Sequence, residues 1–252
     1  MGEIRISEVQ ALLLMVTMSM VPLLFALTVW VRRRGRVQLR PLPGYEVLRG
    51  LAAQAVESGK SLHVSLGRGM VGSGDTAQTL AALSVLDSLV EQGVACDAPP
   101  IITVGEATLL LAAQDRVRGA YARMEHPEGY APTQVRLVAP EPTAYAAGVM
   151  DILAHDDVLA NVMVGSFGDE YLLMGEVGAQ QEIRQVVGVT DSHVLPFAYA
   201  TADHLLIGEE MFAGGAYLAG RPEHIASLRL QDWLRIGIVL VVVLGVLYQT
   251  FL

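Results

Sequence analysis

The sequence predicts an α/β fold: a Rossmann-like three-layer sandwich with a mostly parallel sheet, flanked by an N-terminal and a C-terminal transmembrane helix. Three observations lead to this fold class. Long uncharged runs lie at both ends of the chain, short β-branched segments alternate with helical ones between them, and only 17% of the residues are charged. Globular proteins carry about 25% charged residues, so the composition favours a membrane protein. The strand–helix alternation predicts a parallel sheet covered on both faces.

The first uncharged run, residues 11–31, is long enough to cross a membrane. As a helix it reaches about 31 Å, against a hydrocarbon core of roughly 30 Å. Pro22 inside the run is tolerated in membrane helices, and Trp30 near its end suits the interface. A cleaved signal peptide is the alternative, but residues 1–8 are not basic and no A-x-A site precedes Arg32.

The second uncharged run, residues 236–252, is near the short limit for a spanning helix. A buried core helix is the alternative, and Val and Leu on every face argue against it. Arginines lie on the inner side of both runs, at Arg32, Arg33, Arg34, Arg36 and Arg40 after the first and Arg221, Arg229 and Arg235 before the second. The positive-inside rule then predicts a cytoplasmic middle section and two external termini.

These observations divide the chain into six segments. We expect a short external N-terminus (1–10), a transmembrane helix (11–31), a basic linker (32–44), a cytoplasmic α/β domain (45–222), a juxtamembrane helix (223–235) and a second transmembrane helix (236–252). Residues 41–231 carry 10 basic and 23 acidic side chains, a net charge of −13. Such a surface excludes nucleic acid as a favoured partner, whereas membrane lipid is expected around the two spans.

The elements of the α/β domain are expected in the following order. Strands are predicted at 61–66, 101–104, 135–139, 161–164, 171–174 and 185–189, and helices at 75–92, 106–122, 142–153 and 198–218. A last helix at 224–235 is expected to run into the second span. The first helix shows capping-box spacing from Asp75 to Gln78, and Gly93 is its predicted C-terminal stop.

A glycine-rich loop after the first predicted strand is the clearest candidate binding site. Residues 67–72 form a G-x-G-x-x-G pattern, in which glycines let the backbone approach a phosphate and a following helix offers free amides. The helix starts after this pattern, and the next strand-end acid lies further away than in dinucleotide-binding folds, so a structural turn is the alternative. The candidate ligand-binding residues are Gly67, Arg68, Gly69, Gly72, Ser73, Gly74, Asp75 and Glu106.

Evidence for catalysis is sparse. Carboxylates recur at predicted strand ends and turns, at Glu106, Asp169, Glu170 and Glu176, where they would form a polar pocket or simply be solvated. No G-x-S-x-G or H-E-x-x-H motif occurs, and Cys96 is the single cysteine. We therefore predict no catalytic residue and no metal ligand and leave the cofactor unknown; the absence of a recognisable catalytic motif favours a protein that is not an enzyme but leaves the question open.

Residues 212–220 are unusually rich in glycine and alanine. Small residues at this density allow helices to approach closely, either within the fold or between subunits. The candidate contacts of a homo-oligomer are Gly214, Gly215 and Ala216.

Five stretches of the chain resemble a known family of bacterial two-pass membrane proteins, classed as a domain of unknown function. They read HVSLGRGMVGSGDTAQTLAAL, VRLVAPEPTAYAAGVMDIL, NVMVGSFGDEYLLMGEVG, DHLLIGEEMFAGGAYL and HIASLRLQDWLR. The resemblance covers nearly the whole chain and implies a protein of the bacterial cytoplasmic (inner) membrane. It implies no activity, ligand or site residue.

Three functions follow as hypotheses. The first is a homo-oligomeric membrane scaffold, because a catalytic constellation is missing and small residues are dense near the second span. The second is a sensor that binds a nucleotide or phosphate ligand through residues 67–74. The third is an enzyme that uses strand-end carboxylates.

Overall fold

The computed structural model describes residues 8–34 and 39–251, in which six strands form one parallel sheet. The strands are β1 (Ser61–Gly67), β2 (Ile101–Val104), β3 (Val135–Leu137), β4 (Val158–Ser166), β5 (Arg184–Val189) and β6 (His204–Ile207). Their order is β3-β2-β1-β4-β5-β6, and every neighbouring pair is parallel. This is the Rossmann order, so the predicted fold class is confirmed.

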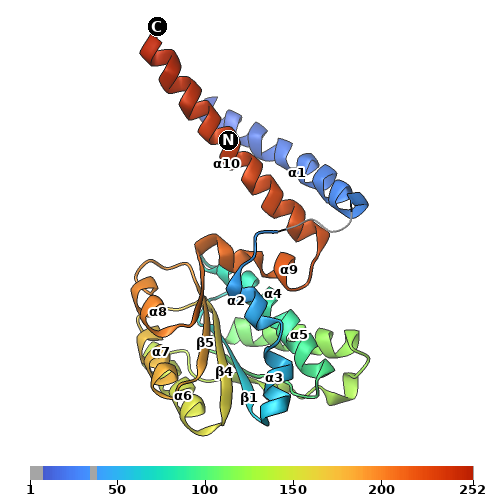
Figure 1. Cartoon of the computed structure of the whole chain (residues 1–252), viewed down its shortest axis with the longest axis vertical. Helices are drawn as coiled ribbons and strands as arrows, with labels where there is room; N and C mark the ends of the chain where they lie inside the picture. The colour runs from blue at the N-terminus through green and yellow to red at the C-terminus, as the bar shows by residue number, and fades with distance from the viewer. Residues whose placement is uncertain (1–7, 35–38, 252) are drawn as a thin grey trace, which may run out of the picture. The chain divides into compact units, whose positions relative to one another are not determined.

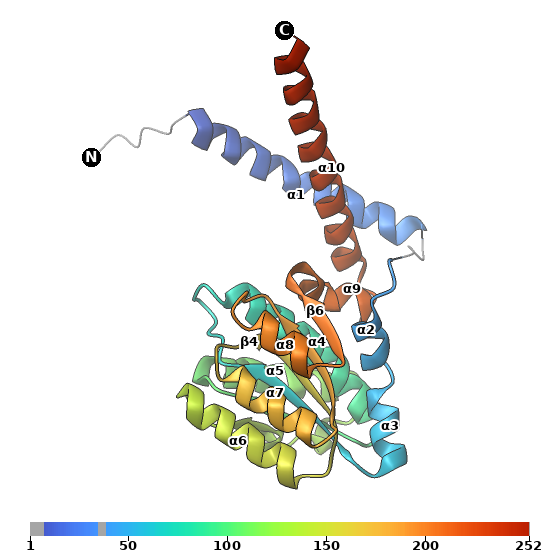
Figure 2. The same cartoon turned by 60° about the vertical axis from the view of Figure 1, so that its left-hand side comes forward.

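Helices cover both faces of the sheet, as Figures 1 and 2 show. One face carries α3 (Leu51–Ser58), α4 (Thr76–Ala95) and α5 (Ala107–Arg123), and the other α6 (Pro142–His155), α7 (Tyr171–Gln180) and α8 (Leu195–Thr201). The remaining elements are α1 (Glu8–Arg34), α2 (Pro43–Leu48), α9 (Gly214–Tyr217) and α10 (Pro222–Phe251), with short 3₁₀ turns η1 (Pro127–Gly129), η2 (Pro132–Gln134) and η3 (Gly208–Ala213).

The chain divides into two compact units. The α/β unit comprises residues 40–219. The helical unit comprises the described parts of 1–39 and 220–252, and it contains two helical segments that are long and apolar enough to cross a membrane, Leu13–Arg33 and Pro222–Thr250. Most side chains of these segments are exposed, as expected of surfaces that face lipid.

The two long helices touch over a short stretch. Leu27 and Val31 of α1 pack against Ala226 and Leu230 of α10, and Arg32 pairs with Glu223 at 2.9 Å. Because α10 runs unbroken from Pro222 to Phe251, the predicted continuation of residues 224–235 into the second apolar run is confirmed.

The strand predicted at 171–174 is wrong, because these residues form the first turn of α7. Tyr171, Met174, Gly175 and Gly178 are buried, which is the spacing of a helix face. A four-residue apolar run does not distinguish a strand from a buried helical turn, and here the helical period lies in the residues that follow it.

The helix predicted at 198–218 is also wrong. Helix α8 ends at Thr201, and β6 then extends the sheet by pairing with β5, with Val186 opposite His204. Gly208, at a φ of +56°, turns the chain into η3. An open edge of β5 would leave backbone groups unpaired, so pairing of residues 204–207 overrides the helical propensity of their neighbours.

The predicted ends of the first helix need correction as well. Helix α4 starts at Thr76 after Asp75, but the Asp75 side chain makes no capping hydrogen bond. Gly93 does not stop the helix, which continues to Ala95. A Cβ on Gly93 would lie 2.8 Å from the carbonyl oxygen of Ala98, so this glycine instead lets the following loop fold back onto the helix.

A row of buried polar side chains crosses the middle of the sheet. His63, Asn161 and Gln185 lie opposite one another on β1, β4 and β5, and all three are fully buried. His63 Nδ1 lies 2.8 Å from Asn161 Oδ1, and Asn161 Nδ2 donates to Gln185 Oε1 at 3.4 Å. Gln185 Nε2 in turn donates to the carbonyl oxygens of Gly175 and Thr201, both at 2.8 Å.

The same network continues toward the carboxyl ends of the strands. His63 Nε2 lies 3.0 Å from Thr103 Oγ1, and the hydroxyl groups of Tyr145 and Ser65 lie 2.7 Å apart. Since Asn161 Oδ1 can only accept, the neutral ring of His63 carries its proton on Nδ1 and accepts from Thr103. Burial lowers the pKa of His63 to about 4, although the bond to Asn161 acts in the opposite direction.

His63 should make the stability of the α/β unit depend on pH. The pKa of His63 falls from 6.5 to about 4 on folding, so the unfolded chain binds the proton first. Above about pH 7, His63 should leave the free energy of unfolding unchanged. As the pH falls from 6.5 to 4, the free energy of unfolding should decrease by about 3 kcal/mol because of this group. Melting temperatures between pH 7 and pH 4 should therefore fall further for the wild type than for His63→Gln. Equal declines would contradict this account.

Candidate functional site

The sheet has one topological switch point, between β1 and β4. Successive connections run from β1 outward to β3 on one side and from β4 outward to β6 on the other. In such sheets ligands bind in the crevice outside the carboxyl ends of the strands at this point. Here those ends are Gly67 and Ser166, which are paired with each other.

Two glycines allow β1 and β4 to meet closely at this edge. Gly67 has a φ of +73° and Gly165 a φ of +155°, conformations that other residues rarely adopt. A Cβ on Gly67 would clash with the carbonyl oxygen of Ser166, and one on Gly165 with that of Leu66. Gly67, the first glycine of the predicted motif, therefore contacts the neighbouring strand.

The rest of the glycine loop is braced by its own hydrogen bonds. The Gly72 amide donates to Thr76 Oγ1 at 2.9 Å, and the Asp75 amide donates to Ser73 Oγ at 3.2 Å. Ser73 Oγ donates in turn to the carbonyl oxygen of Met70 at 2.8 Å. A Cβ on Gly69 would lie 2.5 Å from Thr79 Oγ1, whereas nothing lies near one on Gly74. Two amides predicted to meet a ligand are thus bonded within the loop.

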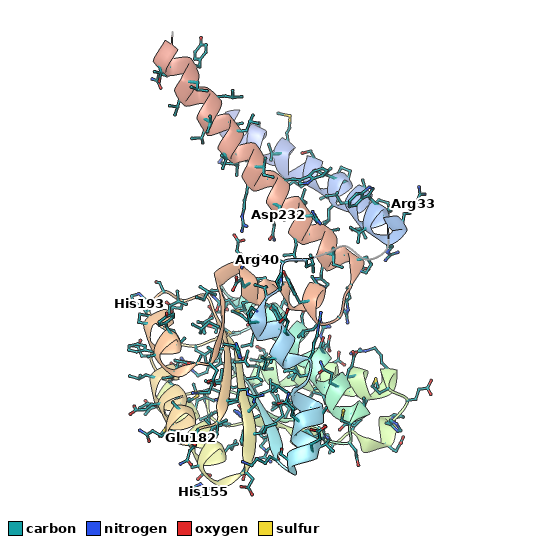
Figure 3. All side chains as sticks on the ribbon, in the orientation of Figure 1. Arg33, Arg40, His155, Glu182, His193 and Asp232 are labelled. Carbon is teal, nitrogen blue, oxygen red and sulfur yellow. The ribbon has the colours of Figure 1, made fainter. Side chains whose placement is uncertain are left out.

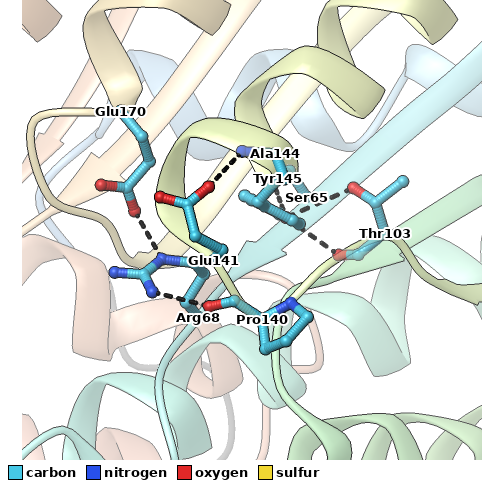
Figure 4. A network of polar contacts seen from close by, with 8 residues as sticks. All are labelled: Ser65, Arg68, Thr103, Pro140, Glu141, Ala144, Tyr145 and Glu170. Atoms are coloured by element: carbon cyan, nitrogen blue, oxygen red, sulfur yellow. Dashed lines mark hydrogen bonds and ion pairs between the residues drawn. The ribbon is translucent and has the colours of Figure 1, made fainter.

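Arg68 is a predicted site residue whose side chain crosses the carboxyl edge of the sheet. Its amide donates to the carbonyl oxygen of Ser166 at 3.0 Å, and its side chain crosses over Gly105 in the loop after β2. The guanidinium then donates through Nη1 to the carbonyl oxygen of Pro140 and through Nε to Glu170 Oε1, both at 3.0 Å. Figure 4 shows these contacts, which join the loops after β1, β3 and β4.

Glu170, the partner of Arg68, is not among the candidate ligand-binding residues predicted from the sequence. Its side chain is only 4% exposed, and that of Arg68 is 28% exposed. A carboxylate this deeply buried is stable as an anion only when a cation or hydrogen-bond donors compensate for lost hydration. The sequence does identify Glu170 as an acid after a strand, but it does not indicate that this one, rather than Asp169 or Glu176, faces Arg68.

Acidic residues precede all four helices that follow β1 to β4. They are Asp75, Glu106, Glu141 and Glu170, at the N-cap positions of α4, α5, α6 and α7. Glu106 accepts from the Thr108 amide at 2.6 Å and Glu141 from the Ala144 amide at 2.7 Å. These carboxylates lie at the helix N-termini where Rossmann-like folds hold phosphates.

The pKa values of two of these caps agree with their hydrogen bonds. Burial raises the pKa of Glu106, but bonds from the Thr108 hydroxyl and from backbone amides outweigh it, so the pKa lies below its usual value. Backbone bonds from Ala144 and Thr143 likewise lower the pKa of Glu141, with Arg68 nearby adding to the effect. Both caps are therefore charged at neutral pH.

The segment predicted as an oligomer contact lies inside the α/β unit. Gly214, Gly215 and Ala216 are buried in α9. A Cβ on Gly214 would lie 2.8 Å from Val85 Cγ2 and 3.5 Å from the Tyr45 hydroxyl. The structure thus gives these small residues an intramolecular packing role, and their contact with a second copy stays a prediction.

The two chain segments that connect the α/β unit to the long helices are bonded to each other. Tyr217 donates from its hydroxyl to the Arg40 carbonyl oxygen at 2.7 Å, and its ring stacks on Tyr45 at 5.2 Å between centroids. Arg40 pairs with Glu210 at 2.7 Å, and the buried Tyr45 hydroxyl donates to the Glu210 carbonyl oxygen at 2.7 Å. We call Arg40, Tyr45, Glu210 and Tyr217 the tether clamp.

The opposite edge of the sheet carries polar grooves. One, of about 500 Å³, is lined by residues that include Lys60, Glu182, Arg184 and Asp203 at the amino ends of the strands. Figure 3 shows Glu182 and His155 at this end of the α/β unit, and Arg40 and His193 at the other. Within the described residues, no group of three His, Cys, Asp or Glu side chains could hold a metal ion.

The comparisons with known proteins identify the family. A family model described as "Domain of unknown function (DUF6754)" matches residues 3–252, so the chain belongs to that family. No curated protein matches the chain, and no solved structure matches it.

Proposed function

We propose that the protein is a membrane-anchored sensor whose α/β unit binds a small molecule at the carboxyl ends of β1 and β4. The observation that carries this proposal is the Arg68–Glu170 pair at the topological switch point. Loops that follow β1, β3 and β4 meet at Arg68. Their contacts fix the position of the Arg68 guanidinium before a ligand binds.

The tether clamp supports a sensing role. Glu210 lies in η3, directly after the carboxyl end of β6, and it bonds to Arg40 at the start of the α/β unit. The connections to both apolar helices are therefore fixed to the same edge of the sheet that carries the Arg68–Glu170 pair. A ligand that shifts the loops at this edge would act on the segments that lead to the membrane.

The contacts of the loop and of the helix N-termini disfavour the phosphate-binding mode that the G-x-G-x-x-G pattern predicts. The Gly72 and Asp75 amides are bonded within the loop, and Glu106 and Glu141 accept from the amides of their own helices. A phosphate at these helices would meet carboxylates that already use the same donors.

A defined panel of small molecules tests the proposed function. We expect at least one member of a panel of ATP, NAD, inorganic phosphate, glucose and the twenty amino acids to raise the melting temperature of the detergent-purified protein. A ligand at ten times its Kd should raise it by about 3–6 °C. The shift should vanish in Arg68→Gln and persist in Arg118→Gln, since Arg118 forms an exposed pair with Asp115 instead. No shift in the wild type, or one that survives in Arg68→Gln, would contradict the proposal.

The arginine distribution supports a protein of the bacterial inner membrane whose α/β unit lies in the cytoplasm. Arg32, Arg33 and Arg34 follow the uncharged run 11–31, and Arg221, Arg229 and Arg235 precede the uncharged run 236–252. Cys96, the single cysteine, lies in the α/β unit and is partly exposed. A membrane-impermeant maleimide should therefore label Cys96 only after intact cells are opened. Equal labelling of intact and opened cells would place this unit outside.

A homo-oligomeric membrane scaffold is the second candidate function. It is favoured by the narrow contact between α1 and α10, which leaves most apolar side chains of both helices exposed. Identical copies that share a membrane plane can associate through modest contacts. Light scattering in mild detergent should then give a protein mass of several times 27.0 kDa. A monomeric mass in both mild detergent and lipid nanodiscs would reject the scaffold.

A further inference from the structure

The Arg68–Glu170 pair leaves one polar atom on each residue without a hydrogen-bond partner in the described part of the chain. Arg68 uses Nε and Nη1, and Glu170 uses Oε1, while Nη2 and Oε2 make no hydrogen bond to the described part of the chain. In Figure 4, the second terminal nitrogen of Arg68 and the second oxygen of Glu170 point to the same side of the pair. The pair therefore holds one unpartnered donor and one unpartnered acceptor, with the acceptor on a side chain that is only 4% exposed.

The charges around the pair disfavour a simple anion. Arg68 is neutralised by Glu170, and Asp75, Glu106 and Glu141 add negative charge at the neighbouring helix N-termini. An anion would gain little from a neutralised arginine and would be repelled by these carboxylates. A simple cation would find Glu170 already compensated by Arg68. A ligand that carries both charges can satisfy both atoms through charge-assisted hydrogen bonds while leaving the pair intact.

We propose that this pair recognises an α-amino acid. The ligand carboxylate would accept from Arg68 Nη2, and its ammonium group would donate to Glu170 Oε2. An α-amino acid carries these two groups on one carbon atom, which matches a donor and an acceptor that belong to a single ion pair. The assignment rests on the proposed function, because it names the ligand class of the same site.

Matched fragments of the ligand test this assignment. In melting experiments on the full-length protein in detergent, at least one of the twenty amino acids should raise the melting temperature by about 3–6 °C at ten times its Kd. The corresponding acid without the amine, and the corresponding amine without the carboxylate, should produce no shift at the same concentration. Either fragment acting as well as the intact amino acid would overturn the assignment.

The Glu170→Gln variant gives a second, independent readout. It removes the charge but keeps the shape of the side chain, so Arg68 is left without its neutralising partner. The shift caused by the amino acid should disappear, and the matched carboxylic acid should now raise the melting temperature. A residue that only maintains the fold would not produce this exchange of ligand preference. Arg118→Gln is the control that should keep the wild-type response.

The outcomes separate this inference from the proposed function. If ATP, NAD, phosphate or glucose causes a shift that depends on Arg68 while the amino acids cause none, the site binds a ligand but the amino-acid class is wrong. If no probe causes a shift that depends on Arg68, both proposals are wrong. Should Glu170→Gln fail to fold, the comparison of intact amino acid and fragments on the wild type still decides the assignment.

Discussion

The close approach of β1 and β4 at their carboxyl ends is the constraint on which the rest of the site depends. Gly67 and Gly165 both need positive φ, and each lies against a carbonyl group of the other strand. Because Ser166 accepts from the Arg68 amide, this contact fixes where Arg68 leaves the sheet and which loops its side chain reaches. The position of the Arg68–Glu170 pair thus follows from backbone geometry at the switch point.

The polar row across the sheet explains how the strands keep their register. Strands covered on both faces by helices could slide if they were purely apolar, because one β-branched residue packs much like another. His63, Asn161 and Gln185 are buried, so a shift of one residue would leave their polar atoms without partners. The register of β1 against β4 in turn places Gly67 opposite Ser166. The polar network therefore helps to fix the position of the candidate site.

The sequence predicts the fold class well because its main signals are local. Alternating strands and helices imply a parallel sheet, and the two uncharged runs are recognised by length and composition alone. The errors arise where tertiary contacts decide. Residues 204–207 become a strand because β5 offers an unpaired edge, and Tyr171–Met174 become helical because every third or fourth residue there meets the core.

The candidate site shows the same limit. The glycine pattern directs attention to the loop after β1, and Arg68 is in it. What the pattern does not reveal is that Gly67 and Gly69 face other parts of the chain, or that Glu170, 102 positions after Arg68, completes the pair. Nor does composition show whether small residues such as Gly214 pack within one chain or between two. Such pairings depend on the sheet order, which sequence spacing alone does not give.

A double-mutant cycle on Arg68 and Glu170 tests the central claim most directly. The free energy of unfolding would be measured for the wild type, Arg68→Gln, Glu170→Gln and the double variant. If Arg68 and Glu170 stabilise the fold through their mutual contact, the effects of the two substitutions on the free energy of unfolding should be coupled by about 1–3 kcal/mol. Arg68→Gln should be the more destabilising substitution because it leaves the Glu170 carboxylate buried and uncompensated. Additive effects, with a coupling energy near zero, would contradict the account.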